Sequence, residues 1–345
     1  MQLVFMYYAL FQRGNDKMKH YISVALCTYN GEKYIKQQLE SIIDQTELVN
    51  EIIIGDDGST DKTIQIAKEV LEDAKIDYKI ICNTVNLGFC KNFENVISHT
   101  KGDIIFLSDQ DDVWESDKVE VMIRDFDHNE NSLVIFSNAN LVNENMERLP
   151  GTLWDAVYYT EKENKKSEWF ELLLSGNYMT GAAMAFRRSL FEQTKPFPKN
   201  VYHDEWLAVH AALYGDIEKE ERKLINYRQH GKNVCGAVVH HTILEKFKYK
   251  KNIINNLLVT QQNDHKARYQ FWQEVYRSIV EKEVYDKELK KIEKCMEFHG
   301  EFLKNHSKWK LVGFTLKAMA MGEYGKFVKK PVGCFVGDLL YSIIK

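Results

Sequence analysis

The chain has 345 residues, and 46 Lys and Arg against 50 Asp and Glu leave a formal charge of −4. With 44% apolar and 28% charged residues, the composition excludes a disordered or fibrous chain and suits one large domain with an appendage, or two domains. The near-neutral balance argues against nucleic acid as the main partner, because binding to phosphates takes clustered Lys and Arg.

The cysteines and the beginning of the chain bear on its location. Six cysteines are scattered without a C-x-x-C pair, which predicts reduced thiols in a cytoplasmic protein, with neither disulfides nor a zinc site. No stretch reaches the roughly 18 uninterrupted apolar residues of a membrane-spanning helix. The apolar start lacks a basic leader and a small-residue cleavage site. We therefore interpret residues 1–17 as a non-structural extension and not as a signal peptide.

Strand-like and helix-like segments alternate from about residue 20 to residue 140. Apolar strand candidates cover residues 21–26, 51–54, 78–82, 103–107 and 133–137. Between them apolar residues recur at helical spacing, as at Ile35, Leu39 and Ile42. Continuous apolar strands separated by helices predict an α/β fold with a mostly parallel sheet and helices on both faces. Such sheets bind ligands beyond the carboxyl ends of their strands.

Polar loops follow three of these strands. They read Cys27-Thr28-Tyr29-Asn30-Gly31, Asp56-Asp57-Gly58-Ser59-Thr60-Asp61 and Ser108-Asp109-Gln110-Asp111-Asp112-Val113-Trp114. The second loop also fits a plain turn with a helix N-cap, because Asp, Ser and Thr accept backbone N–H bonds.

The third loop is acidic and suggests a cation. Three carboxylates within four residues repel one another unless a cation neutralises them, and hard oxygen ligands suit Mg²⁺ or Mn²⁺ bridging a diphosphate. A solvated acidic turn is the alternative. Neither an EF-hand loop nor a G-x-G-x-x-G dinucleotide loop fits the sequence.

Taken together, the motifs resemble those of a known family. The run from Ile22 to Trp114 also holds Asn86-Leu87-Gly88, and further motifs follow at residues 175–181, 203–206 and 227–233. Over roughly residues 20–236 the chain resembles a family 2 glycosyltransferase of the GT-A fold, a Rossmann-like and mostly parallel sheet covered by helices. The Ser-Asp-Gln-Asp-Asp-Val-Trp and Tyr-Arg-Gln-His-Gly variants are similar to those of bacterial rhamnosyltransferases that build cell-envelope polysaccharides.

The resemblance implies a donor-binding site. Asp57 would hydrogen-bond the pyrimidine of the donor, and Tyr29, beside Thr28, would pack on its ring. Asn92 would help to line the nucleotide sugar, and Gly181 would let the backbone pass close to donor or acceptor.

The resemblance also implies a metal site. The metal-binding D-x-D of the family falls on Asp109 and Asp111, with Asp111 as the direct ligand and Asp109 also facing the donor. His230 matches a C-terminal histidine that completes the metal and diphosphate site in many members of this fold. The implied cofactor is Mg²⁺ or Mn²⁺.

Asp204 is the implied catalytic base of an inverting enzyme. It opens an apolar helical run and would take the proton of the acceptor hydroxyl as that oxygen attacks the anomeric carbon in a single displacement. A helix N-cap is the alternative role for Asp204, and Glu205 is a nearby substitute for the base.

The chain changes character beyond Gly236. From Ala237 to His299 it has neither Gly nor Pro, and apolar residues recur at helical spacing. They are Leu244, Phe247, Ile254, Leu257, Leu258, Tyr269, Trp272, Val275, Tyr276 and Ile279. We expect residues 237–345 to form a helical region that packs on the catalytic domain, residues 18–236, or on a second subunit, which leaves a homodimer open.

The last segment, residues 309–345, is basic. Six Lys against one Glu and one Asp give a balance of +4, with aromatic residues interleaved. This composition suits a peripheral contact with anionic lipid on the inner face of a bacterial membrane, beside a lipid-linked acceptor. A helical subdomain with a solvated basic face is the alternative.

The sequence thus predicts an inverting, metal-dependent glycosyltransferase. Its donor would be a nucleotide-diphosphate sugar, with dTDP-rhamnose favoured over a UDP-sugar, and its acceptor a hydroxyl of a saccharide or lipid-linked acceptor. One alternative is a sugar nucleotidyltransferase, which would be expected to carry a Gly-rich basic loop after its first strand; another is a catalytically inactive nucleotide-sugar binding module. The motifs do not name the sugar, the acceptor or the linkage.

Overall fold

The structure is a computed structural model that describes residues 20–159, 169–230, 262–282, 285–304 and 306–344. The extension at residues 1–17, Cys235 and the apolar positions from Leu244 to Leu258 lie outside the described residues. The five cysteines within the described residues are free thiols, as expected.

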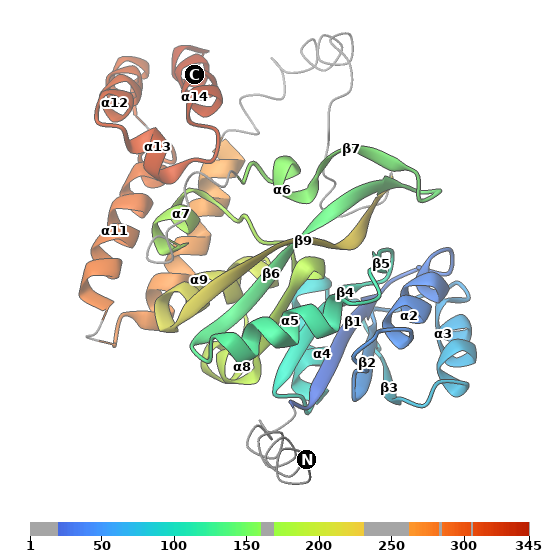
Figure 1. The fold of residues 1–345 in the computed structure, drawn as a ribbon. Helices are drawn as coiled ribbons and strands as arrows, with labels where there is room; N and C mark the ends of the chain where they lie inside the picture. The colour runs from blue at the N-terminus through green and yellow to red at the C-terminus, as the bar shows by residue number, and fades with distance from the viewer. Residues whose placement is uncertain (1–19, 160–168, 231–261, 283–284, 305, 345) are drawn as a thin grey trace, which may run out of the picture.

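The first part of the chain alternates strands and helices around a parallel sheet (Figure 1). The strands pair in the order β3-β2-β1-β4, all parallel. Their bounds are β1 Ile22–Thr28, β2 Glu51–Asp56, β3 Asp77–Cys82 and β4 Ile104–Asp109. The helices between them are α2 Ile35–Ile43, α3 Thr63–Glu72 and α4 Phe89–His99. These strands and helices confirm the predicted elements.

The sheet continues beyond β4 as a mixed sheet in the order β4-β8-β6-β9-β5, with β7 paired to β6. β8 is antiparallel to both of its neighbours, β6 and β9 are parallel, and β5 is antiparallel to β9. The bounds are β5 Val113–Trp114, β6 Ser132–Asn143, β7 Arg148–Thr152, β8 Met184–Arg187 and β9 Asp216–Gln229. The helices of this part are α5 Lys118–His128, α6 Leu153–Ala156, α7 Trp169–Ser175, α8 Arg188–Thr194 and α9 His203–Tyr214.

Both faces of the sheet are buried, as predicted. Along β1, Val24 and Leu26 join one apolar cluster and Ala25 joins the other, and all three are fully buried. Alternate residues of a strand point to opposite faces, so a continuous apolar run is what a sheet covered on both sides requires.

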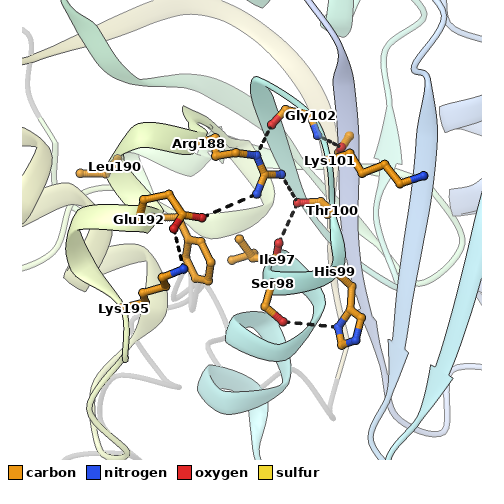
Figure 2. Close-up of polar contacts among 12 residues, drawn as sticks. Ile97, Ser98, His99, Thr100, Lys101, Gly102, Arg188, Leu190, Glu192 and Lys195 are labelled. Carbon is orange, nitrogen blue, oxygen red and sulfur yellow. Dashed lines mark hydrogen bonds and ion pairs between the residues drawn. The ribbon is translucent and has the colours of Figure 1, made fainter.

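Arg188 ties the amino end of β4 to α8, away from the carboxyl ends of the parallel strands (Figure 2). Its Nε donates to the carbonyl of Gly102 at 2.7 Å, and its Nη2 donates to the hydroxyl of Thr100 at 2.7 Å. Hydrogen bonds from a charged group are stronger than neutral ones. These bonds fix the amino end of β4 to α8. They leave the carboxyl ends of the parallel strands uninvolved.

The C-terminal region is helical, as predicted. Residues 262–279 are helical, and α11 Asp286–Glu301, α12 Lys308–Ala320, α13 Glu323–Phe327 and α14 Pro331–Ile344 follow (Figure 1). Trp272, Val275 and Ile279 are fully buried in the cluster that also holds Trp206 of α9. The helical region therefore shares one apolar core with the sheet.

Candidate active site

A cavity of about 890 Å³ opens at the carboxyl ends of β1, β2 and β4. Every residue that the sequence predicts for the site lies on its wall: Thr28, Tyr29, Asp57, Asn92, Asp109, Asp111, Gly181, Asp204 and His230. The residues from Thr28 to Asp111 come from the carboxyl ends of the parallel strands and from the loops and the helix that follow them. Gly181, Asp204 and His230 come from later segments of the chain.

Asp57 is buried at the base of the cavity. Its Oδ1 accepts the N–H of Leu87 at 2.7 Å and its Oδ2 accepts the N–H of Gly88 at 2.9 Å. The Nδ2 of Asn83 also donates to Oδ1, at 3.0 Å. The turn role expected for this loop falls on Asp56, which accepts the N–H of Ser59 at 2.8 Å. Because a carboxylate oxygen can accept two hydrogen bonds, Oδ2 of Asp57 keeps capacity for a ligand.

Three further donor-site residues differ in how free their side chains are. Tyr29 is 53% exposed, and its phenol ring can stack against a planar group. The Thr28 hydroxyl instead donates to Asp56 at 2.8 Å. The Asn92 amide is buried, and its Nδ2 donates to the carbonyl of Gly55 at 2.8 Å. Asn92 therefore forms the cavity wall with its amide already bonded.

The acidic loop divides its three carboxylates between the cavity and the interior. Asp109 and Asp111 line the cavity. Asp112 points away from it and is 1% exposed, with Oδ1 accepting the N–H of Arg228 at 2.9 Å. Burial, together with the charges of Asp111 and Asp204, raises the pKa of Asp109 to about 7.

Lys118, which the sequence analysis missed, lies beneath the acidic loop. It is fully buried, and its Nζ donates to the carbonyl of Ala182 at 2.8 Å and lies 3.9 Å from the Trp114 ring centroid. Burial lowers the pKa of Lys118 to about 7, while the charges of Asp112 and Asp109 act in the opposite direction. The only sequence signal was a Lys at the start of an apolar helical run.

His230 lies beside the acidic loop. Its Nε2 is 2.8 Å from Oδ2 of Asp111, within hydrogen-bonding distance. Its ring stacks on Tyr34, with 5.0 Å between the centroids. The guanidinium of Arg228 lies 4.6 Å from the same Tyr34 ring and donates to the carbonyl of Asp111 at 2.7 Å. Strand β9 thus brings Arg228, and His230 directly after its end, to a loop that lies more than a hundred residues earlier in the chain.

Asp204 is the second residue of α9. The helix cap is Tyr202, which makes no side-chain capping bond, so the N-cap alternative for Asp204 is wrong. Its Oδ2 accepts the N–H of Gly181 at 3.1 Å, and its Oδ1 accepts the N–H of Glu205 at 2.7 Å. Burial raises the pKa of Asp204 to about 7, in the range that suits a general base at neutral pH.

The neighbours of Asp204 on α9 face different surroundings. His203 lines the cavity, is stacked on Phe93 at 4.0 Å, and its ring nitrogens have no hydrogen-bond partner among the described residues. Burial lowers the pKa of His203 to about 3, which keeps the ring neutral. Glu205 is absent from the cavity wall and forms a buried ion pair with Arg268 of the helical region.

The cavity side chains fit a divalent cation. Within the described part of the chain, no three His, Cys, Asp or Glu side chains form a ready-made metal cage. Mg²⁺ and its analogues are usually held by one or two carboxylates together with substrate phosphates. Asp109 and Asp111 offer two carboxylates whose mutual repulsion raises the pKa of Asp109, and a cation would relieve that repulsion.

A mostly parallel sheet, a cavity at its carboxyl edge, an acidic loop and a carboxylate facing that loop define a glycosyltransferase of the GT-A type. The glycosyl transferase family 2 profile matches residues 23–194. RfbG, a dTDP-rhamnosyl transferase of Shigella flexneri, is 30% identical over 239 residues, which cover 66% of this chain and 77% of RfbG. An uncharacterized glycosyltransferase of Haemophilus influenzae is 26% identical over 227 residues, which cover 64% of this chain and 68% of that protein. The chain belongs to glycosyl transferase family 2.

Solved structures share the fold. TarS of S. aureus, residues 1–349 in complex with UDP-GlcNAc, superposes with a TM-score of 0.54 at 19% identity, covering 92% of this chain and 81% of that one. The mannosyltransferase PcManGT of Pyrobaculum calidifontis, in complex with GDP-Man and Mn²⁺, gives a TM-score of 0.50 at 12% identity. The match covers 98% of this chain and 93% of that one. The predicted GT-A fold with a helical C-terminal region is confirmed.

Proposed function

We propose that this glycosyltransferase inverts the anomeric centre by a single displacement, with Asp204 as the base. The observation that carries the proposal is that Asp204 shares one cavity with Asp109 and lies close enough for its charge to raise the pKa of Asp109. A base and a diphosphate-binding loop in one cavity suit an attack in line with the departing diphosphate.

In this mechanism the acceptor oxygen forms a bond to the anomeric carbon while the bond from that carbon to the diphosphate oxygen breaks. The hydroxyl proton passes to Asp204, and the nucleoside diphosphate leaves with the electron pair. Glu205 does not compete for the proton, because it is buried against Arg268.

Asp109, Asp111 and His230 would hold Mg²⁺ or Mn²⁺. When bound, such an ion neutralises charge on the leaving diphosphate. Lys118, buried under the loop, lies within electrostatic reach of Asp109 and Asp112, whose carboxylates favour its charged form.

The donor would be a nucleotide-diphosphate sugar bound across β1 and β2. The free acceptor capacity of Asp57 Oδ2 and the exposed ring of Tyr29 suit a pyrimidine, through a hydrogen bond to a ring N–H and stacking. We favour dTDP-rhamnose because RfbG is a dTDP-rhamnosyl transferase. A UDP-sugar is the second choice, since TarS was solved with UDP-GlcNAc.

Family membership favours a glycosyltransferase over a sugar nucleotidyltransferase or an inactive binding module. The test is a panel of dTDP-rhamnose, UDP-GlcNAc and GDP-mannose, each with Mn²⁺, read by thermal shift and by release of nucleoside diphosphate. A donor at 100 times its Kd should add about 2.7 kcal/mol to the free energy of unfolding. Stabilisation by dTDP-rhamnose together with release of dTDP supports the proposal. Release that is unchanged in D204N contradicts the role of Asp204.

We also propose that residues 309–345 make a peripheral membrane contact, through the exposed side chains of α12 and α14. In the described residues no helix is both long and apolar enough to cross a bilayer. Three of the six aromatic residues expected at the lipid surface, Tyr324, Phe327 and Tyr341, are buried. The exposed apolar side chains of this segment include Trp309 on α12, at 80%, and a stripe on α14 made of Val332, Val336, Leu340 and Ile343. These side chains, with lysines nearby, suit an anionic lipid surface.

A further inference from the structure

A second cavity, of about 1010 Å³, lies among α7, α11, α12 and α13, helices that group at one end of the molecule (Figure 1). Glutamates at three positions and lysines at five line it. The lysines are Lys291, Lys294, Lys317, Lys326 and Lys329. Lys291 is already paired with Glu171, and Lys294, Lys317 and Lys326 are exposed. The cavity therefore has a positive balance.

Lys329 is the least exposed of the cavity lysines that are not paired with Glu171. It lies between α13 and α14, and its Nζ is 4.2 Å from the Tyr178 ring centroid. Its stem fills the space beside Gly176, where an added Cβ would meet Lys329 carbons at 3.0 Å. Burial lowers the pKa of Lys329 to about 8, and the carboxylates of Glu205 and Asp204 oppose this shift. The ammonium thus lies within electrostatic reach of the base.

One short segment connects the two cavities. Ser175 and Tyr178 line the basic cavity, and Thr180 and Gly181 line the catalytic cavity. Gly181 in turn bonds the base, Asp204. The same short segment therefore lines the basic cavity and bonds the base.

We propose that the basic cavity binds a phosphate or diphosphate group of the acceptor. Lysine ammonium groups are compact charges on flexible stems and bind phosphate oxygens well. Phe298, Phe314 and Phe327 give the same cavity an apolar wall, which suits an acceptor whose phosphate adjoins an apolar group. The assignment to the acceptor depends on Asp204 being the base, whereas the phosphate site itself does not.

The test measures binding of inorganic pyrophosphate to the full chain in EDTA by calorimetry, without metal or donor. The variant K294E/K317E reverses two charges on the cavity wall. Its matched control, K290E/K310E, reverses two exposed charges on the same helices, α11 and α12, at positions outside the wall. We expect the Kd to rise at least about tenfold in the cavity variant and less than about twofold in the control. Both variants should bind dTDP or UDP with Mn²⁺ as the unmodified chain does.

Three results of the calorimetry would contradict the phosphate site. Unchanged pyrophosphate binding in K294E/K317E, an equal loss in K290E/K310E, or no binding by the unmodified chain overturns the site. Retained nucleotide binding shows that the variants are folded, and a failed D204N test would leave the pyrophosphate result standing. Farnesyl diphosphate distinguishes the sources of the phosphate: tighter binding than pyrophosphate, lost in the same variant, indicates a lipid-linked group. Equal affinity indicates a water-soluble phosphate.

Discussion

The backbone N–H of Gly181 donates to Oδ2 of Asp204 across 3.1 Å. This contact joins the segment after α7 to the first turn of α9 and fixes the direction of the proposed base. A hydrogen bond to the ionised carboxylate also limits the rise in its pKa, which burial brings to about 7. The carboxylate is therefore held in place and still basic enough to take a proton near neutral pH.

The first prediction concerns the base. D204N keeps the shape of the side chain but removes the proton acceptor, so turnover should fall by about 10² to 10⁴ while donor affinity stays nearly unchanged. Steady-state kinetics and donor calorimetry measure the two quantities. Loss of donor binding in D204N would point to a structural role instead.

The pH dependence of kcat/KM follows from the same group. Asp204 must be deprotonated to act, and its pKa is about 7. The rate should therefore rise with pH up to about 7 and fall about tenfold per unit below it. This acid limb should be missing from the residual activity of D204N. A limb centred near 4, the ordinary range of an Asp, would contradict the assignment.

Gly181 should tolerate no side chain. A Cβ at this position would lie 2.7 Å from Nε2 of His203, and the stacking of His203 on Phe93 leaves the ring little room to move. We expect G181A to lower turnover at least about tenfold and to lower the Tm. The double variant G181A/H203A removes the clash, so its loss of stability should be smaller than the sum of the two single losses. Additive losses of stability in the double variant would show that the contact is not the cause.

Asp111 and Asp112 should separate metal binding from stability. D111A should abolish the Mn²⁺-dependent part of nucleoside diphosphate affinity, measured by calorimetry, and keep the fold. D112A leaves the buried N–H of Arg228 without its acceptor, which should cost about 1 to 3 kcal/mol of stability. Its Mn²⁺ dependence should remain. Equal Mn²⁺ dependence in D111A and the unmodified chain would exclude Asp111 as the ligand.

The membrane contact should depend on α14. V336D places a charge in the exposed apolar stripe and should weaken binding to vesicles that contain anionic lipid. L48D, at a comparably exposed apolar residue between α2 and β2, is the control and should bind as the unmodified chain does. Salt should weaken binding without abolishing it, because the lysine attraction is screened over about 8 to 10 Å and apolar burial is not. A chain that ignores such vesicles at low salt has no membrane contact here.

The sequence alone determined the parallel strands β1 to β4 and the polar loops at their carboxyl ends. Strands such as Ile22–Thr28 are continuous apolar runs, and a run of this kind can only be buried on both faces. Polar loops after parallel strands meet at one edge whatever the details of packing. The order of strands and loops along the chain is therefore enough to bring Thr28, Asp57 and Asp109 together.

Only the tertiary structure decided how adjacent and distant residues divide their roles. Neighbours in one motif face opposite ways: Asp111 lines the cavity while Asp112 is buried, and Asp204 lines it while Glu205 pairs with Arg268. The position of the Lys329 ammonium over the Tyr178 ring depends on how the C-terminal helices pack against the catalytic domain. Such choices rest on contacts between segments far apart in the chain, and a local pattern of residue types does not encode them.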